Sequence, residues 1–155
     1  MPELLSKYRA PETDTCTQDI SPESAGWKYV GFEVFELKEG ETLSQQTGDK
    51  EVCLVLVAGK ANIKSKTLDL NNIGDRMSPF ERKKPYAVYL PDGDEFSLTA
   101  TTDVEVAVCK APGKSGVKAR LITPDDIGSE SRGKGFNKRH VHNILPETEP
   151  ADSLL

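Results

Sequence analysis

The sequence of 155 residues has little of several features that mark particular protein classes. It has two histidines and one tryptophan, and no apolar run approaches the roughly 20 residues needed to span a membrane. The first residues, MPELLSKYRAPETDT, lack the apolar segment of a signal peptide. We therefore expect no membrane partner and a cytoplasmic location.

Cysteine and positive charge are also scarce. Cys16, Cys53 and Cys109 are odd in number and widely spaced, and the last two lie in the apolar runs EVCLVLV and VEVAVCK. Cys53 and Cys109 are interpreted as small core residues of a reduced protein, rather than as members of disulfides or zinc ligands. The 25 acidic and 20 basic residues give a net charge of -5. A nucleic-acid-binding surface is dominated by basic residues, so we expect no nucleic-acid partner.

The chain does have many short segments rich in apolar, aromatic and β-branched residues, which favour strands. A Pro-Asp-Gly turn at 91–93 separates two of them, and its glycine tolerates a positive φ. Short strands at close spacing, with helix limited to one turn at 123–128, predict an all-β sandwich or barrel. The expected strands lie within residues 27–37, 51–57, 58–65, 86–90, 95–102, 103–111 and 118–123.

Composition divides the chain into three parts. Residues 1–25 are polar and contain proline, which predicts an N-terminal arm, and residues 26–127 contain the strands of the barrel. From Gly128 the sequence is first polar and basic and then acidic with two prolines, which is typical of a linker. The final ADSLL could begin a new strand. We therefore interpret 128–155 as a linker and the start of a second, missing domain.

The linker has few residues that could bury apolar surface against the barrel. Ile144, Leu145, Leu154 and Leu155 are the apolar residues expected to anchor it. Ordering each residue costs about 1–2 kcal/mol of backbone entropy. We therefore expect residues 132–155 to be poorly anchored on this barrel, and the four apolar residues to dock on a partner.

The stretch RGKGFNKRHVHNILPE contains both histidines of the chain and the spacing His-x-His-x4-Glu, formed by His140, His142 and Glu147. In a cupin barrel this spacing supplies two imidazoles and a carboxylate to a metal, because residues two apart on a strand share a face. Here the pattern follows the Pro-x-Gly turn that it should precede, and a third histidine is missing. A hydrogen-bonded or solvated pair is the favoured interpretation, and weak or partner-assisted metal binding stays open.

The cupin spacing fits better around Glu51, but without ligands. Counting back from Glu51 places Ser44 and Gln46 at the two histidine positions, and Phe96 stands three residues after the turn at 91–93. Neutral serine, glutamine and phenylalanine do not replace imidazole ligands. The sequence therefore indicates an all-β, cupin-type (RmlC-like jelly-roll) barrel that has lost its metal, with no metal or cofactor in this chain.

Two glycine-containing loops are weaker candidates for anion binding. APGKSG (111–116) resembles a phosphate loop, but the glycine that the pattern requires earlier is Val108 and no helix pattern follows. RGKGFNKR could surround an anion with its glycines and four cations, and a flexible basic linker explains it equally well.

Several long stretches in order resemble the N-terminal half of the 5-deoxy-glucuronate isomerase family, the two-cupin sugar-acid isomerases of inositol catabolism. They include SAGWKYVGFEVFEL, GDKEVCLVLVAGKA, FERKKPYAVYLP and RGKGFNKRHVHNILPETEPADSLL. The resemblance covers about 26–155, and NKRHVHNILP is similar to the crossover between the family's two barrels. His142 matches the Val-His-Asn-Ile-Leu-Pro stretch of the family, whereas His140 is not a fixed feature of it.

The resemblance implies half of an intramolecular oxidoreductase that converts 5-deoxy-glucuronate into 5-dehydro-2-deoxygluconate. The divalent metal of the family lies in the second cupin, which is missing here, so the catalytic residues are unknown and the chain alone is expected to be inactive. The expected partners are the sugar-acid substrate and a second cupin domain or another copy of the chain. The alternative is a stand-alone, metal-free cupin that binds a sugar acid or dimerises. Candidates for contacts with the substrate anion or the other domain are Arg132, Lys134, Arg139 and His142.

Overall fold

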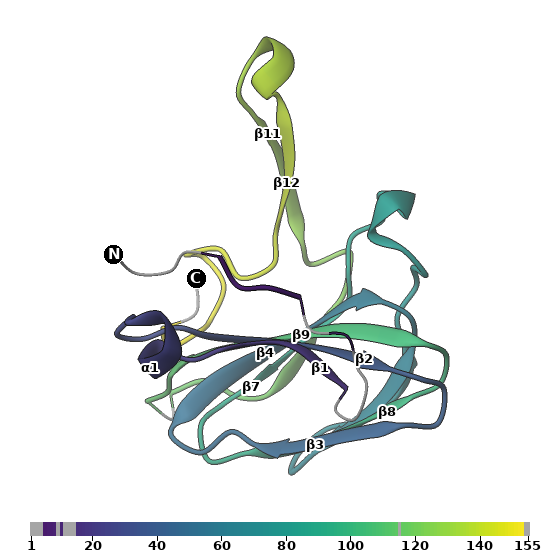
Figure 1. Ribbon diagram of the computed structural model, residues 1–155, viewed down its shortest axis with the longest axis vertical. Helices are drawn as coiled ribbons and strands as arrows, with labels where there is room; N and C mark the ends of the chain where they lie inside the picture. The colour runs from purple at the N-terminus through teal and green to yellow at the C-terminus, as the bar shows by residue number, and fades with distance from the viewer. Residues whose placement is uncertain (1–4, 9, 11–14, 115, 154–155) are drawn as a thin grey trace.

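The computed structural model describes residues 5–8, 10, 15–114 and 116–153. Two antiparallel sheets pack face to face, and a separate two-stranded hairpin projects from them (Figure 1). The prediction of an all-β sandwich or barrel is confirmed.

The larger sheet has six strands, and its central strands are the most apolar in the chain. Each neighbouring pair is antiparallel. In spatial order the strands are β1 (Cys16–Ile20), β2 (Gly31–Leu37), β9 (Val104–Pro112), β4 (Lys50–Ala58), β7 (Ala87–Leu90) and β10 (Arg120–Ile122).

The smaller sheet has four strands, again all antiparallel. Their order is β3 (Thr42–Gln46), β8 (Glu95–Ala100), β5 (Ala61–Ser65) and β6 (Asp69–Ile73). The predicted turn at 91–93 connects β7 to β8, and Gly93 has a φ of 70° there. This turn therefore leads the chain from one sheet into the other.

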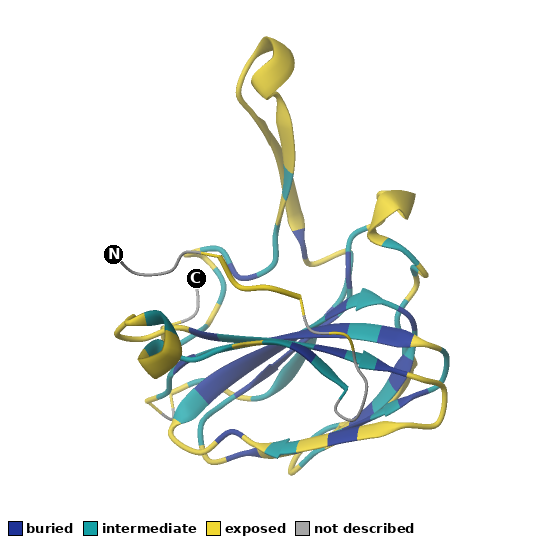
Figure 2. Cartoon of the chain, in the orientation of Figure 1, coloured by how far each residue is buried: buried dark blue, intermediate teal, exposed yellow. Residues whose placement is uncertain are grey.

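The main core fills the space between the two sheets. Along each strand every second side chain points inward, so Val52, Leu54 and Leu56 of β4 face Ile63 of β5 and Leu98 of β8 across an apolar interior. A second, smaller core covers the opposite face of the six-stranded sheet. Strand β4 is therefore buried on both faces, as its continuous apolar run predicts (Figure 2).

Helix is limited to short turns in the described part of the chain. They are α1 (Pro22–Ala25), η1 (Pro79–Glu81) and η2 (Gly135–Asn137). The expected helical turn at 123–128 is a hydrogen-bonded turn in which the Asp126 carboxylate accepts from the N–H and the hydroxyl of Thr123. No described helix has the length and hydrophobicity that crossing a membrane requires.

Four segments contain strands that the sequence does not predict, and two of these segments lie outside the expected barrel. The polar arm, 1–25, includes β1, which pairs with β2 and buries Thr17. The expected linker forms a hairpin of β11 (Gly128–Arg132) and β12 (Arg139–Asn143). The strands β1, β11 and β12 were not predicted because their sequences are polar. They are strands because each one pairs with a neighbouring strand.

Gly59 forms the turn between β4 and β5 at a place where the backbone is crowded. Its φ is 89°, and a Cβ atom added there would lie 2.1 Å from the carbonyl oxygen of Asp103. Gly40 has a similar φ of 87° but open space around it. Substituting Gly40 by alanine tests the cost of a left-handed conformation alone, whereas substituting Gly59 adds the cost of a steric clash.

We predict that Gly59→Ala lowers the free energy of unfolding by more than about 3 kcal/mol, because it adds a backbone clash to the strain of a positive φ. Gly40→Ala, the matched control, should lose only about 1–2 kcal/mol, the cost of the conformation itself. Urea denaturation of both variants measures this difference. Equal losses would show that the turn at Gly59 relaxes away from Asp103.

Candidate functional site

The positions counted as metal ligands do not meet inside the barrel. Leu43 of β3 is buried in the core, whereas Ser44 and Gln46 are exposed on the other side of the strand. Phe96 is the one counted residue that points into the core. The alignment of Ser44 and Gln46 with interior ligand positions is therefore wrong, because a shift of one residue moves a side chain to the opposite face.

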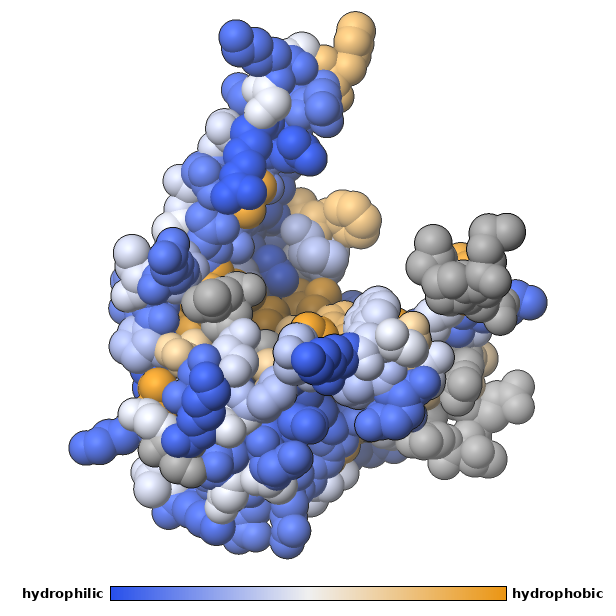
Figure 3. Space-filling view, turned by 90° about the vertical axis from the view of Figure 1, so that its left-hand side faces the viewer, coloured by the Kyte–Doolittle hydropathy of each residue, from blue (hydrophilic) through white to orange (hydrophobic). Residues whose placement is uncertain are grey.

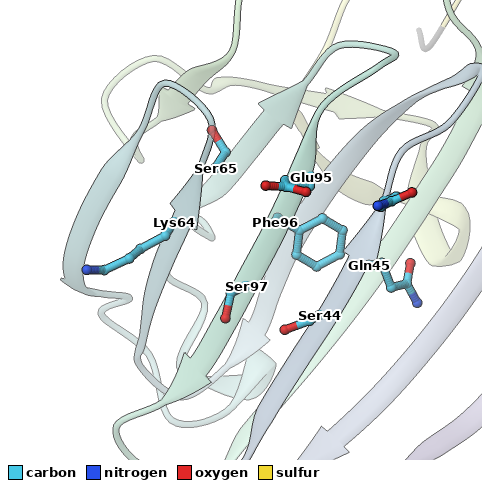
Figure 4. A pocket seen from close by; sticks show the side chains of 8 residues that line it. Ser44, Gln45, Lys64, Ser65, Glu95, Phe96 and Ser97 are labelled. Atoms are coloured by element: carbon cyan, nitrogen blue, oxygen red, sulfur yellow. The ribbon is translucent and has the colours of Figure 1, made fainter.

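The outward side chains of the smaller sheet line a shallow depression of about 430 Å³ (Figure 4). Ser44, Lys64 and Ser97 contribute to it from three neighbouring strands. Within residues 5–8, 10, 15–114 and 116–153, no group of three His, Cys, Asp or Glu side chains is arranged to hold a metal ion. The described residues of this chain therefore do not fit the metal that the cupin fold suggests.

The inward face carries one polar group that the sequence reasoning missed. Glu33 of β2 lies on the same side of its strand as the buried Phe35, and its carboxylate accepts from Lys110 Nζ at 2.6 Å and Gln45 Nε2 at 2.9 Å. The Lys110 and Glu33 side chains are only 24% and 18% exposed. The sequence does contain a signal for this group. Glu33 is a charged residue that shares one face of its strand with core residues, and a charge in that position requires a partner.

Glu51, from which the ligand positions were counted, does not face the interior of the barrel. Its neighbour Val52 faces the main core, so the Glu51 side chain lies on the outer face of the six-stranded sheet, where it is fully buried. One carboxylate oxygen accepts from the Tyr89 hydroxyl at 2.5 Å and from the Asp152 N–H at 2.7 Å. The other oxygen accepts from the Ser153 N–H at 2.6 Å. Glu51 therefore joins β4 to the C-terminal segment.

Arg120 completes this buried cluster on the outer face. Its guanidinium carbon lies 4.8 Å from the centre of the Tyr89 ring, which is a favourable cation–π geometry. Both terminal guanidinium nitrogens are buried and have no hydrogen-bond partner among the described residues. Burial, together with the hydrogen bond to Glu51, raises the pKa of the Tyr89 hydroxyl, so this group remains a hydrogen-bond donor at neutral pH.

The loop that resembles a phosphate loop holds a carboxylate of the same chain. The N–H of Lys114 donates to Asp152 Oδ2 at 2.7 Å, and the N–H of Gly116 donates to it at 3.5 Å. A Cβ atom at Gly116 would lie 2.8 Å from the Asp152 carboxylate. Ser115 lies outside the described residues. In this structure the loop therefore binds the C-terminal segment from one side, while Glu51 binds it from the other.

The C-terminal segment after the hairpin is therefore anchored. Leu145 is buried beside Tyr89 and Cys53 in the second core, and Ile144 packs against this core. The prediction of poor anchoring is wrong for residues 144–153, because backbone hydrogen bonds to Glu51 add to the small apolar contact. Leu154 and Leu155, also predicted to dock, lie outside the described residues.

The four candidate anion or interdomain residues lie along the hairpin and are exposed. Arg132 and Arg139 face each other across the strands, and Arg132 Nη2 donates to Glu130 at 2.5 Å. Lys134 lies in the connection at the tip. His142 points to the opposite face of β12 from Arg139. The hairpin thus brings the two arginines together but not all four residues.

His140 and His142 share one face of β12. The Nδ1 atom of His140 lies 3.0 Å from the Ser131 hydroxyl, and the Nδ1 atom of His142 lies 3.3 Å from the Ser129 hydroxyl. The interpretation of a hydrogen-bonded pair is confirmed. Asn143 is the last residue of β12, and its side-chain amide donates to the Glu130 carboxylate at 2.9 Å.

The fold defines the class of protein. The two packed antiparallel sheets form a cupin-type, RmlC-like jelly-roll barrel. The solved structure of YlbA from E. coli superposes with a TM-score of 0.55 at 16% identity, covering 83% of this chain and 52% of that chain, which supports the fold alone.

The model of the KduI/IolB family matches residues 4–155, and the chain belongs to this family. A protein named 5-deoxy-glucuronate isomerase from Geobacillus kaustophilus is 52% identical over all of this chain and 56% of its own length. One of the same name from Bacillus subtilis strain 168 is 36% identical over 98% of this chain and 58% of its own. The crystal structure of an IolB-like protein from Salmonella typhimurium has a TM-score of 0.92 at 50% identity, covering 97% of this chain and 56% of that chain. The chain thus spans about half the length of these relatives.

Removing the Glu51 carboxylate should release the C-terminal segment. We predict that Glu51→Ala lowers the free energy of unfolding by about 3–5 kcal/mol, because it leaves the buried Tyr89 hydroxyl and two part-buried amides without their acceptor. Tyr89→Phe, the control, removes one hydrogen bond and should lose about 1–2 kcal/mol. Hydrogen exchange at the Asp152 and Ser153 amides should accelerate in Glu51→Ala. Unchanged exchange at these amides would contradict the anchoring role of Glu51.

The buried thiol of Cys53 generates a prediction for alkaline pH. Burial, and secondly the neighbouring Cys109, raises the pKa of Cys53 from 9.0 to about 12. A group whose pKa is raised by folding stabilises the protein fully below its unfolded pKa, and this stability is lost as pH rises towards the folded pKa.

We therefore predict that between pH 9 and about 12 the wild type loses stability with pH more steeply than Cys53→Ala. The difference in slope should be about 1.4 kcal/mol per pH unit, the effect of one proton. Urea unfolding under reducing conditions at several pH values measures both slopes. Parallel pH profiles would mean that the Cys53 thiol ionises within the folded protein.

Proposed function

We propose that this chain is the N-terminal, structural half of a 5-deoxy-glucuronate isomerase. The observation that carries the proposal is the 52% identity, along the whole chain, to the Geobacillus kaustophilus protein of that name. The structural match to the IolB-like protein covers a similar share of the larger chain and supports the same division. In this proposal, residues 26–127 are the first of two barrels, and residues 128–155 lead to the second.

The proposed reaction is the isomerisation of an aldehyde acid, 5-deoxy-glucuronate, to a ketose acid, 5-dehydro-2-deoxygluconate. The carbon beside the aldehyde loses its proton and the aldehyde carbon gains one, while the proton of the neighbouring hydroxyl is replaced by one on the aldehyde oxygen, so that no external oxidant is required. The general base for this transfer belongs to the other half of the protein in our proposal. A divalent metal is also assigned to that half, because the residues of this barrel do not provide its ligands.

This chain contributes a rigid barrel and a positively charged hairpin. Among the described residues, apolar side chains fill much of the interior between the two sheets. The exposed cations of the hairpin suit a contact with the carboxylate of a sugar acid or with an acidic surface of the adjoining half. The residues proposed for these contacts are Arg132, Lys134, Arg139 and His142.

The role of a stand-alone sugar-acid-binding or dimerisation module is not favoured as the function. The relatives that match all or nearly all of this chain are named as isomerases and continue well beyond the matched region. We place the protein in the cytoplasm, which the reduced state of Cys53 and Cys109 supports.

A chimera tests the proposal directly. We predict that this chain, fused to the remaining C-terminal portion of the Geobacillus kaustophilus relative, converts 5-deoxy-glucuronate, whereas the 155-residue chain alone does not. The ketose product is measured by NMR in the presence of added divalent metal. A folded, metal-loaded chimera without activity, or comparable activity of the chain alone, would contradict the proposal.

The same chimera tests the hairpin. Replacing Arg132 and Arg139 together by alanine should raise KM for the acidic substrate about tenfold if these side chains contact its carboxylate, the loss expected for a charge-assisted contact. The matched control replaces Lys38 and Lys64, exposed cations of the barrel, and should leave KM unchanged. Equal KM values in both double variants would assign the arginines to protein contacts instead.

A further inference from the structure

Arg82 follows η1 in a backbone conformation that few side chains adopt. Its φ is 60°, and in the described part of the chain Asn72 is the only other non-glycine residue with a positive φ. Such strain persists where the surrounding structure imposes it, and it is concentrated at binding sites. Here Arg76 Nη1 donates to the carbonyl oxygen of Lys83 at 2.7 Å, and Lys83 Nζ donates to Asp75 Oδ1 at 3.1 Å. These contacts fix the loop that carries Arg82.

The Arg82 side chain is left for a contact outside this loop. It is exposed, and it forms no hydrogen bond or ion pair with any residue that the structure describes. Lys83, by contrast, is paired with Asp75 and Glu81. Arg82 lines a cleft of about 790 Å³ between η1 and the hairpin of β11 and β12. A guanidinium held at a cleft without a carboxylate partner suits an oxyanion, which it can bind through two parallel hydrogen bonds.

The hairpin wall of the cleft presents two imidazoles with fixed orientation. His140 and His142 line the cleft from one face of β12, opposite Ser131 and Ser129 of β11. In each pair the serine hydroxyl lies within hydrogen-bond distance of the Nδ1 atom. When Nδ1 accepts from the hydroxyl, the Nε2 atom carries the proton. Neither Nε2 atom has a hydrogen-bond partner among the described residues, so both can donate to a ligand.

Charge decides whether this cleft takes an anion or a metal cation. Residues 128–143 contain four cations and one acid, a net charge of +3, and residues 75–84 contain four cations and two acids, a net charge of +2. Figure 3 shows the hydrophilic side chains that cover most of the hairpin. Glu130, the acid that lines the cleft, has its carboxylate bound by Arg132 and Asn143. Positive walls repel a divalent cation and attract an anion, so the two imidazoles are placed as donors rather than as metal ligands.

The rest of the lining suits a sugar. The hydroxyls of Ser129 and Ser131 keep further hydrogen-bonding capacity beside the imidazoles. Pro79 and Val141 add apolar surface, against which the C–H groups of a sugar can pack. Pockets for small molecules have volumes of about 300–1,000 Å³ and combine apolar walls with a few placed polar groups. A sugar acid matches this cleft, because it brings a carboxylate for the guanidinium and hydroxyls for the other polar groups.

We propose that this cleft binds the sugar-acid substrate, with its carboxylate on Arg82 and its hydroxyl oxygens on the Nε2 groups of His140 and His142. The proposal rests on the proposed function and adds Arg82 to the candidate residues of the hairpin. His142 is one of those candidates and lines the cleft, whereas Arg132 and Arg139 lie on the other face of the hairpin. These two arginines are then left for the acidic surface of the adjoining half. The carbonyl end of the substrate extends to that half, to which the metal and the general base are assigned.

A binding test uses the 155-residue chain and D-glucuronate, a stable sugar acid, with glucose as the uncharged control at constant ionic strength. The ring-proton NMR signals of the two histidines in the sequence report directly on the cleft. Glucuronate should shift both signals until they saturate, with a Kd at least about tenfold lower than that of glucose, the gain from one charge-assisted contact. Equal Kd values for the two sugars, or histidine signals that glucuronate does not shift, would overturn the proposal.

Two variants of the same loop separate direct contact from general charge. Arg82→Gln removes the guanidinium and should raise the Kd for glucuronate at least about tenfold. Lys84→Gln, the matched control, removes a nearby cation that does not line the cleft, and should change Kd by less than about twofold because salt screens charges that make no contact. His140→Gln, on the other wall, should also raise Kd. Equal losses in Arg82→Gln and Lys84→Gln would show that the positive potential alone attracts the sugar acid, which contradicts a built site.

The chimera shows whether the substrate itself occupies the cleft. There Arg82→Gln should raise KM for 5-deoxy-glucuronate at least about tenfold and leave kcat within about twofold, because Arg82 holds the end of the substrate remote from the reacting carbons. An unchanged KM, together with glucuronate binding to the chain alone, would give the cleft to a carboxylate of the adjoining half and overturn the proposal. An inactive chimera would contradict the proposed function, whereas the binding test on the chain alone would still decide the existence of the site.

Discussion

The buried carboxylate of Glu51 is the interaction on which the arrangement beyond the barrel depends. It accepts hydrogen bonds from Tyr89 on the neighbouring strand and from two consecutive backbone amides, Asp152 and Ser153. A fully buried carboxylate is tolerated only when its oxygens are satisfied. The chain after the hairpin must therefore return to the outer face of the sheet, and this return covers the second core and brings Asp152 to the loop at 114–116.

The two faces of the six-stranded sheet consequently have different roles. The inner face is filled by apolar side chains, with Glu33 and Lys110 paired among them. The outer face holds the charged cluster of Glu51, Tyr89 and Arg120 beneath the C-terminal segment. A metal bound by a cupin-type barrel would lie in its interior, whereas the Glu51 cluster of this chain lies on the outer face of the six-stranded sheet. This distribution supports the structural role that we propose for this chain.

Much of the fold could be predicted because its strands carry clear patterns. The segments that form β2, β4, β7, β8, β9 and β10 are rich in apolar and β-branched residues. Strands β1, β3 and β6 were not predicted, because they lie at the edges of their sheets and have polar sequences such as TLSQQ. The hairpin was missed for the same reason. Of the candidate site, the hydrogen-bonded character of His140 and His142 could be predicted, but the role of Glu51 could not.

The sequence by itself determined the all-β class, the turn at 91–93 and membership of the family, because these depend on local composition and on residues in order. Only the tertiary structure decided which face of a strand each side chain occupies. A period of two defines two faces, but it does not say which one meets the core when both are apolar, as in EVCLVLV. Glu51 was therefore assigned to the interior by spacing, whereas packing places it outside. Two of the three partners of its carboxylate, the Asp152 and Ser153 amides, lie about a hundred residues away, and only folding brings them together.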